Sequence, residues 1–310
     1  MSIDSLHHVG HVIADVGHAL ASYRRMGFHV PPLQRPVLPD HPGRPSRAVG
    51  VANSHIGFAH EFVELIAVVD DGPYPDDEIA PAPLTAPAAA LPDLDQAIAA
   101  TAARLTAALA RFEGLHVLCF GTADADATAA RLHADGVTHS GVKRARRPST
   151  TGGAEVPIGY LEIDDSPGLS PEGRLAVSEP LPQDRTEHPN GAFRLAGTIL
   201  CVTDDELADH EARYRRYLHR AARDDGPART FDLGGQWLTI VPQSGLGQLL
   251  PGERPQALPA FVAYAVEVRS PEATRRYLHS AGVPLRACPA GDAVVPAASA
   301  LGAAVIFRGA

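Results

Sequence analysis

The chain has 310 residues, which exceeds the size that a single hydrophobic core usually serves and therefore predicts two domains. Hydrophobic residues make up 45% and charged residues 20% of the chain, as in typical folded globular proteins, and the net charge of −9 argues against a nucleic-acid partner. No apolar run approaches the ~20 residues of a membrane span, and the first residues lack a signal-peptide pattern, so we expect a cytoplasmic protein with no membrane partner.

One pattern occurs four times along the chain. An apolar strand, an acidic or small turn, an amphipathic helix and several short β-rich segments follow one another in each copy. The copies begin at His7, Leu115, Gly197 and Phe261. The strands predicted after the helices are 54–58, 62–69, 157–163, 174–179, 229–233, 237–241 and 303–307. Each copy is therefore predicted to be a βαβββ module, in a chain of the α+β class.

Three segments lie outside this repeat. Residues 70–91 are rich in Pro, Ala and Asp and are predicted to be a surface loop. The segment of about 92–112 has Leu and Ile at helical spacing, which predicts a helix inserted between modules one and two. Residues 180–192 break both periodicities and predict a linker. We therefore expect two domains, 1–190 and 191–310, with two modules in each.

The first two modules carry matching polar residues in apolar strands. His8 and His116 lie 19 and 20 residues before the glycine that closes the helix of their module. Glu64 and Glu179 each lie among apolar residues in the last strand, where a carboxylate is costly to bury unless it is paired or binds a cation. Two imidazoles and two carboxylates suit one divalent ion, namely Zn, Fe, Mn, Co or Ni. Modules three and four lack these residues.

Other residues compete for these roles. His7 and His11 are neighbours of His8 on the first strand, and Glu162 is an alternative to Glu179 as the fourth ligand. The cysteines form no CxxC pair and are predicted to be small core residues rather than ligands. They are Cys119, Cys201 and Cys288.

Several segments resemble the vicinal oxygen chelate superfamily, in particular its glyoxalase-like domain proteins. The resemblance is carried by HHVGHVIADVGHALASYRRMGF, ANSHIGFAHEFVELI, LHVLCFGTADADATAARLHADGV and EHPNGA. In that superfamily, paired βαβββ modules form a curved mixed β-sheet around a metal ion, with the helices outside. The resemblance implies His8, Glu64, His116 and Glu179 as ligands in the first domain, and a similar but metal-free second domain. Extradiol dioxygenases of the superfamily hold iron in the second pair of modules, whereas the predicted ligands lie in the first pair, as in glyoxalase I.

The predicted site favours a metal-dependent lyase or isomerase with a small-molecule substrate. A divalent ion can bind two neighbouring substrate oxygens and stabilise an enediolate, with Glu64 or Glu179 as the general base. Asn53, His60 and Tyr160 are polar residues of predicted inner strands and are candidates for the substrate pocket. The alternatives are a non-haem Fe(II) dioxygenase and a non-catalytic binding protein similar to antibiotic-resistance members of the superfamily. A homodimer is compatible with each of these functions.

Overall fold

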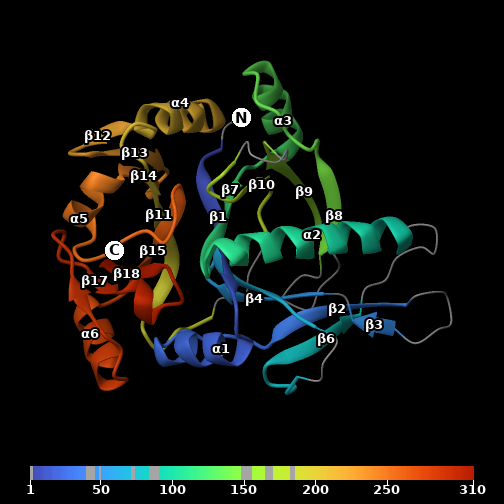
Figure 1. Ribbon diagram of the computed structural model, residues 1–310, viewed down its shortest axis with the longest axis horizontal. Helices are drawn as coiled ribbons and strands as arrows, with labels where there is room; N and C mark the ends of the chain where they lie inside the picture. The colour runs from blue at the N-terminus through green and yellow to red at the C-terminus, as the bar shows by residue number, and fades with distance from the viewer. Residues whose placement is uncertain are drawn as a thin grey trace.

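The computed structural model is an α+β structure of four βαβββ modules, which confirms the predicted fold class. It describes residues 3–39, 46–48, 50–70, 74–83, 91–147, 156–164, 170–181 and 186–310. Figure 1 shows two halves side by side, each with strands inside and module helices at the periphery.

The modules follow one another in chain order. Module one contains β1 (Ser5–Ile13), α1 (Val16–Arg25), β2 (Leu33–Pro39), β3 (Ser46–Ala48), β4 (Val51–Gly57), β5 (Phe62–Val68) and β6 (Ile79–Pro83). The inserted helix α2 (Leu91–Arg111) leads to module two, which contains β7 (Gly114–Gly121), α3 (Ala125–Ala134), β8 (Lys143–Arg147), β9 (Val156–Ile163) and β10 (Arg174–Ser178). Module three contains β11 (Ala192–Val202), α4 (Leu207–Leu218), β12 (Arg223–Asp225), β13 (Ala228–Leu233), β14 (Gln236–Pro242), η2 (Gln243–Gly245) and α5 (Leu246–Leu249). Module four contains β15 (Ala260–Val268), α6 (Pro271–Ser280), β16 (Arg286–Ala287), β17 (Ala293–Val295), η3 (Ala297–Ser299) and β18 (Ala304–Gly309).

Capping side chains fix where the helices of the first two modules begin. Asp15 accepts a hydrogen bond from the backbone N–H of His18 at 2.8 Å, and Asp124 accepts one from Ala127 at 2.9 Å. After α1, Gly27 has a φ of +82°, in the left-handed region that favours glycine and ends a helix. The two helices therefore start at equivalent points, and the strands before them can be compared residue by residue.

Strand pairing follows one rule in all four modules. The first strand pairs in parallel with the last strand of its module, as β1–β5, β7–β10, β11–β14 and β15–β18. The first strands of successive modules pair antiparallel, as β1–β7 and β11–β15. Each half is therefore a curved mixed sheet with a concave face. In the first half, α2 lies across this face, and its Leu105 packs against Val12, Ile66 and Val117.

One hydrophobic core runs through both halves. The ring of Phe28 stacks on that of Phe307 with the centroids 5.8 Å apart, and the hydroxyl of Tyr264 donates to that of Tyr23 at 3.3 Å. Because the halves share this core, the predicted division of the chain at residue 190 stays a prediction.

The prediction for residues 70–91 was partly wrong. Of this segment the structure describes residues 70, 74–83 and 91, and β6 pairs there in parallel with β2. Pro81 and Pro83 donate no backbone hydrogen bond, which a strand tolerates at the edge of a sheet. Composition pointed to a loop because proline is rare inside sheets, but an edge strand accommodates it.

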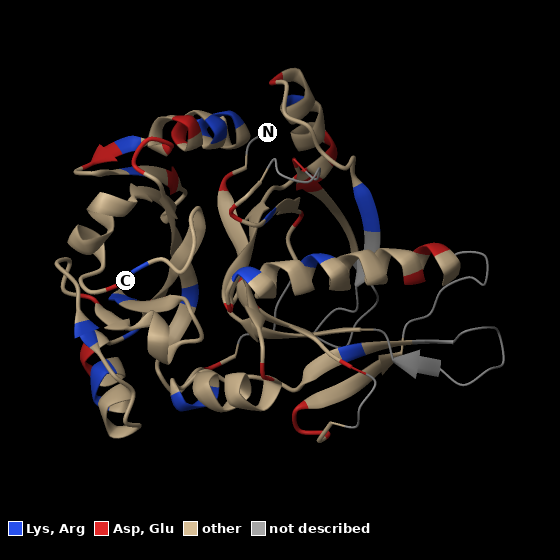
Figure 2. Cartoon of the chain, in the orientation of Figure 1, with Lys and Arg blue, Asp and Glu red and all other residues tan. Residues whose placement is uncertain are grey.

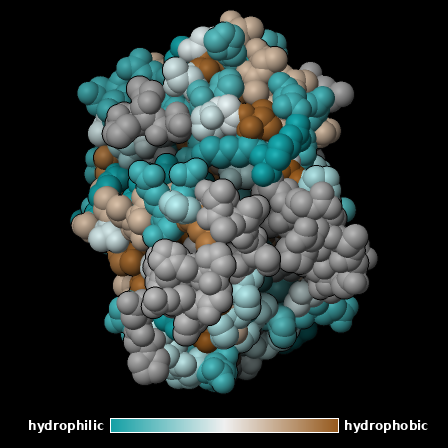
Figure 3. Space-filling model, turned by 90° about the vertical axis from the view of Figure 1, so that its right-hand side faces the viewer, coloured by the Kyte–Doolittle hydropathy of each residue, from teal (hydrophilic) through white to brown (hydrophobic). Residues whose placement is uncertain are grey.

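The face of the molecule that forms the right-hand side of Figure 1 is mainly hydrophilic where the structure describes it. Figure 3 shows only scattered hydrophobic side chains on that side of the molecule. No helix in the described part of the chain combines the length and the hydropathy that crossing a membrane requires.

Candidate metal centre

A bulge in β1 brings two consecutive histidines together. In a regular strand, neighbouring side chains point to opposite faces. The pairing of β1 with β7 shifts register between Leu6 and His8, so that His7 is an extra residue in the strand. The Nδ1 atoms of His7 and His8 lie 2.8 Å apart as a result.

Four side chains meet at this bulge, and we call them the His/Cys/Glu cluster. Cys119 of β7 lies opposite His8, and His7, His8 and Cys119 each offer one ligand atom within 4.8 Å of the other two. Glu64 of β5 adds a carboxylate, whose Oε2 lies 3.6 Å from Nε2 of His8. His7 and Cys119 are buried, while His8 and Glu64 are half-buried. The structure thus brings the predicted ligands His8 and Glu64 together.

Module one also holds the carboxylate of Glu64 from the other side. The side-chain amide of Asn53 donates a hydrogen bond to Oε1 at 2.6 Å, and Nε2 of His55 lies 3.9 Å from the same oxygen. The rings of His8 and His55 both stack on Phe62, with centroid distances of 4.4 and 4.1 Å. Glu64 is therefore fixed in position by neighbours on β1 and β4.

Burial and neighbouring charges set the protonation states of the cluster. Burial alone raises the pKa of Glu64, but the attraction of His55 and His8 and the hydrogen bond of Asn53 outweigh it and bring that pKa to about 2. Burial lowers the pKa of His7 to about 4 and that of His8 well below its usual value. Near neutral pH the carboxylate is therefore ionised and both imidazoles are neutral.

These states fit a divalent ion. Metal ligands must be neutral imidazoles, ionised carboxylates or thiolates, and this mixed set suits a transition metal. Among the described residues, Nε2 of His7 is buried and has no hydrogen-bond partner within bonding distance, so this nitrogen could bind an ion. Burial raises the pKa of Cys119, so this thiol would lose its proton only to a bound cation.

Strand register corrects the predicted equivalence of His8 and His116. His8 and Val117 each lie seven residues before the capping aspartate of the next helix. The glycine-based spacing differed by one residue, and in a strand one residue moves the side chain to the other face. The ring of His116 packs at a tilt against that of Phe112, with the centroids 4.2 Å apart, and its Nε2 lies 2.9 Å from the carbonyl oxygen of Phe112. The described contacts do not bring His116 to the His/Cys/Glu cluster.

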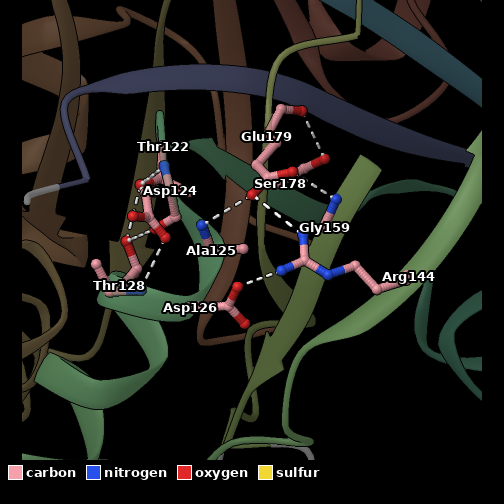
Figure 4. A network of polar contacts seen from close by, with 10 residues as sticks. Thr122, Asp124, Ala125, Asp126, Thr128, Arg144, Gly159, Ser178 and Glu179 are labelled. Carbon is pink, nitrogen blue, oxygen red and sulfur yellow. Dashed lines mark hydrogen bonds and ion pairs between the residues drawn. The ribbon is translucent and has the colours of Figure 1, made fainter. Parts of the chain in front are cut away.

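Glu179 likewise makes contacts elsewhere. Its Oε1 accepts a hydrogen bond from the backbone N–H of Ala125 at 3.1 Å, and its Oε2 accepts one from Gly159 at 2.7 Å. Figure 4 shows this carboxylate at the first turn of α3, where Arg144 also reaches it. By register, Ala176 holds the place in module two that the carboxylate of β5 holds in module one. Both oxygens of Glu179 are thus already occupied.

Of the remaining predicted residues, one contacts the cluster and the others have no described contact with it. Asn53 contacts the cluster through Glu64, as described above. His60 is exposed, and Tyr160 is half-buried on β9. The alternative ligand Glu162 is buried and paired with two arginines, Arg174 at 2.7 Å and Arg104 at 3.0 Å.

The matching place in the second half is filled by apolar side chains. Gly197 lies opposite Ala265 in the β11–β15 pair, as His8 lies opposite Cys119. A Cβ atom added to Gly197 would lie 2.2 Å from the ring of Trp237, so the indole occupies the space of a side chain. Thr239 lies two residues after Trp237, where module one has its carboxylate.

Sequence reasoning missed His55 and underrated His7 and Cys119. A bulge cannot be read from a period of two, so the sequence presents His7 as a competitor of His8 and not as a second ligand beside it. Cys119 lies among apolar neighbours in its strand, which predicts a core residue. The capping aspartates could have indicated it. Cys119 lies five residues before Asp124, as Gly10 lies five before Asp15, so Cys119 is equivalent to a position two residues from His8 on the same face of the strand.

Comparison with known proteins decides the family. A family model described as a glyoxalase-like domain matches residues 6–218, which is more than half of the chain. The chain belongs to the glyoxalase-like domain family. This membership confirms the resemblance to the vicinal oxygen chelate superfamily. A search of curated proteins found no match.

Solved structures share the fold of this glyoxalase-like chain at low sequence identity. A Mn(II)-bound glyoxalase from Novosphingobium aromaticivorans is 11% identical, with a TM-score of 0.55 over 99% of this chain and 82% of that one. A mutant of 4-hydroxymandelate synthase from Streptomyces coelicolor is 14% identical, with a TM-score of 0.51 over 93% of this chain and 78% of that one. A fusion of a xylose isomerase-like TIM barrel with 4-hydroxyphenylpyruvate dioxygenase is 13% identical, with a TM-score of 0.51 over 99% of this chain and 49% of that one. These similarities concern the fold alone.

Proposed function

We propose that the chain is a divalent-metal-dependent enzyme of lyase or isomerase type, with the ion held by the His/Cys/Glu cluster. The observation that carries this proposal is a carboxylate oxygen of Glu64 3.6 Å from Nε2 of His8, with a second imidazole and a thiol beside that imidazole. A divalent ion would bind two neighbouring oxygens of a small molecule and stabilise the charge of an enediolate.

We assign separate roles to the residues in and around the cluster. A carboxylate with a pKa of about 2 is a weak base, so Glu64 is better suited to hold a cation than to remove a proton. His55 is an imidazole next to the cluster that is not one of its proposed ligands. Its Nε2 lies 3.9 Å from Oε1 of Glu64, and we assign it the role of general base. Asn53 keeps Glu64 oriented by its hydrogen bond of 2.6 Å.

Metal titration tests the proposal. Wild-type protein, stripped and reloaded with Mn(II) or Zn(II), should bind one equivalent by elemental analysis. His8→Ala and Glu64→Ala should lose this equivalent, because each removes a donor from the cluster. His55→Ala should keep it, as should the control His60→Ala, whose side chain is exposed.

Two outcomes would contradict the proposal. Stoichiometric metal in a His8→Ala/Glu64→Ala double variant that is folded by circular dichroism would reject these ligands. Loss of metal in His116→Ala or Glu179→Ala would favour the four-ligand set predicted from the sequence. No metal in the wild type would leave a small-molecule binding protein as the function.

A non-haem Fe(II) dioxygenase is the second candidate, because one structure of similar fold includes a 4-hydroxyphenylpyruvate dioxygenase. The test is to load the protein with Fe(II) anaerobically and admit oxygen. A change in the absorption spectrum together with oxygen uptake would favour the dioxygenase over the lyase or isomerase.

A further inference from the structure

A pocket of about 400 Å³ lies between α2 and the sheet of the first half, and we call it the α2 pocket. Its lining combines apolar walls with charged groups. The residues that matter here are Arg104, Leu105 and Arg111 of α2, and Val117, Glu162 and Arg174 of the sheet.

Two arginines share a single carboxylate in this pocket. Nη2 of Arg174 lies 2.7 Å from Oε1 of Glu162, and Nη1 of Arg104 lies 3.0 Å from Oε2. A guanidinium has five N–H donors, so each arginine keeps donors beyond this contact. Their side chains are 38% and 53% exposed, whereas that of Glu162 is 5% exposed. The free donors are therefore accessible and the shared carboxylate is not.

The other charged groups of the lining already have partners. Arg111 donates to the carbonyl oxygens of Pro171 at 2.7 Å and Pro259 at 3.0 Å. Asp164 accepts hydrogen bonds from the hydroxyls of Thr138 and Tyr217. Figure 2 shows that the basic residues of α2 lie in its middle and C-terminal parts, with the acidic ones at its N-terminal end. Arg104 and Arg174 carry two positive charges against the one negative charge of Glu162, so this side of the α2 pocket has a net positive charge.

This side of the α2 pocket is adjacent to the His/Cys/Glu cluster. Arg174 lies opposite Val117, and Ala176 lies opposite Cys119, so the arginine is one step along the same face of the sheet. Two residues along a strand span ~7 Å. This separation matches the length of a ligand of a few carbon atoms.

We propose that the α2 pocket binds the distal carboxylate of an aliphatic 2-oxo dicarboxylic acid, whose other end lies at the His/Cys/Glu cluster. This inference rests on the proposed function and specifies its substrate class. Leu105 and Val117 contact the methylene groups, while Arg104 and Arg174 donate to the carboxylate. Glu162 holds both guanidiniums in place and at the same time competes with the ligand for them.

Calorimetric titration of the Mn(II)-loaded protein tests the inference with two ligands of equal chain length. 2-Oxoglutarate has the distal carboxylate, and 2-oxopentanoate has a methyl group in its place. Charge-assisted hydrogen bonds to two guanidiniums should make 2-oxoglutarate bind at least about tenfold more tightly. Arg174→Met and Arg104→Met should reduce this preference, and the exposed control Arg276→Met should retain it. Glu162→Gln should strengthen 2-oxoglutarate binding several-fold, a gain that mere damage to the fold would not produce.

The outcomes separate the two proposals. Equal affinity for the two acids, no binding of either acid to the metal-loaded protein, or an unchanged preference in a folded Arg104→Met/Arg174→Met variant would overturn the inference while leaving the metal site intact. Failure of the wild-type protein to bind Mn(II) would overturn the proposed function, and the inference would fall with it.

Discussion

At the scale of single residues, the hydrogen bond from Asn53 to Glu64 can be tested directly. Asn53→Ala should weaken metal binding by about tenfold, because removing a group that orients a metal ligand typically costs 10- to 100-fold in affinity. Competition with a chromogenic chelator would measure the change. The matched control is Ser54→Ala, since Ser54 is the next residue of β4 and its hydroxyl donates to the carbonyl oxygen of Pro31 instead. Equal affinities of the two variants would show that Asn53 does not position Glu64.

The sequence indicates that histidine and glutamate side chains form the site more clearly than it indicates which of them do. His8 and Glu64 are predicted ligands because charged or polar groups in apolar strands need partners, and the structure brings these two side chains together. His116 and Glu179 share that signature, but Nε2 of His116 is hydrogen-bonded to the carbonyl oxygen of Phe112, and Glu179 accepts hydrogen bonds at the first turn of α3. An isolated polar residue shows that a partner is needed, and it does not show which partner.

At the scale of elements, His188 fastens the linker between the halves to module one. The backbone N–H of His29 donates to its Nδ1 at 3.0 Å, and its Nε2 donates to the carbonyl oxygen of Gly57 at 3.1 Å. Burial lowers the pKa of His188 to about 4, below its unfolded value of about 6.5. The neutral form is therefore favoured in the fold, so its stabilisation is complete above pH ~6.5 and is lost as the pH falls towards 4.

His188→Gln should accordingly flatten the pH dependence of stability. Glutamine keeps a donor for Gly57 but does not titrate, so the variant should lose about 2 kcal/mol less unfolding free energy than wild type between about pH 7 and 5. Urea unfolding at both pH values would measure this difference, with the exposed His60→Gln as control. The same loss in His188→Gln and wild type would exclude His188 as the source.

Elements were predicted well wherever local signals were complete. Helices with capping aspartates and closing glycines were placed correctly, as was α2 from its apolar spacing. The edge strand β6 was missed because its pairing with β2 is a long-range contact that its proline-rich sequence does not encode locally.

At the scale of the whole molecule, the shared core predicts that the two halves unfold together. Trp237 is the one tryptophan of the chain, and it lies in the second half, so its fluorescence reports on modules three and four. Phe28→Ala removes a ring of the first half that stacks on Phe307, at a cost of about 3–5 kcal/mol. The variant should shift the fluorescence and far-UV circular dichroism transitions by the same amount.

Separate transitions would contradict this prediction. If Phe28→Ala lowered the dichroism midpoint and left the Trp237 midpoint unchanged, the halves would be independent domains, as the length of the chain alone suggests. The exposed variant Arg276→Ala should leave both midpoints in place.

In modules three and four, the ring of Trp237 fills the space that a side chain at Gly197 would need. The strands of these modules keep the pairing geometry of the first half, and the difference lies in the side chains, with Gly197 and Trp237 where the first half has His8 and Phe62. The second half therefore offers a backbone of the same geometry in which a second site could be designed. Such a design would carry Gly197→His, Trp237→Phe and Thr239→Glu, which place there the residue types of His8, Phe62 and Glu64.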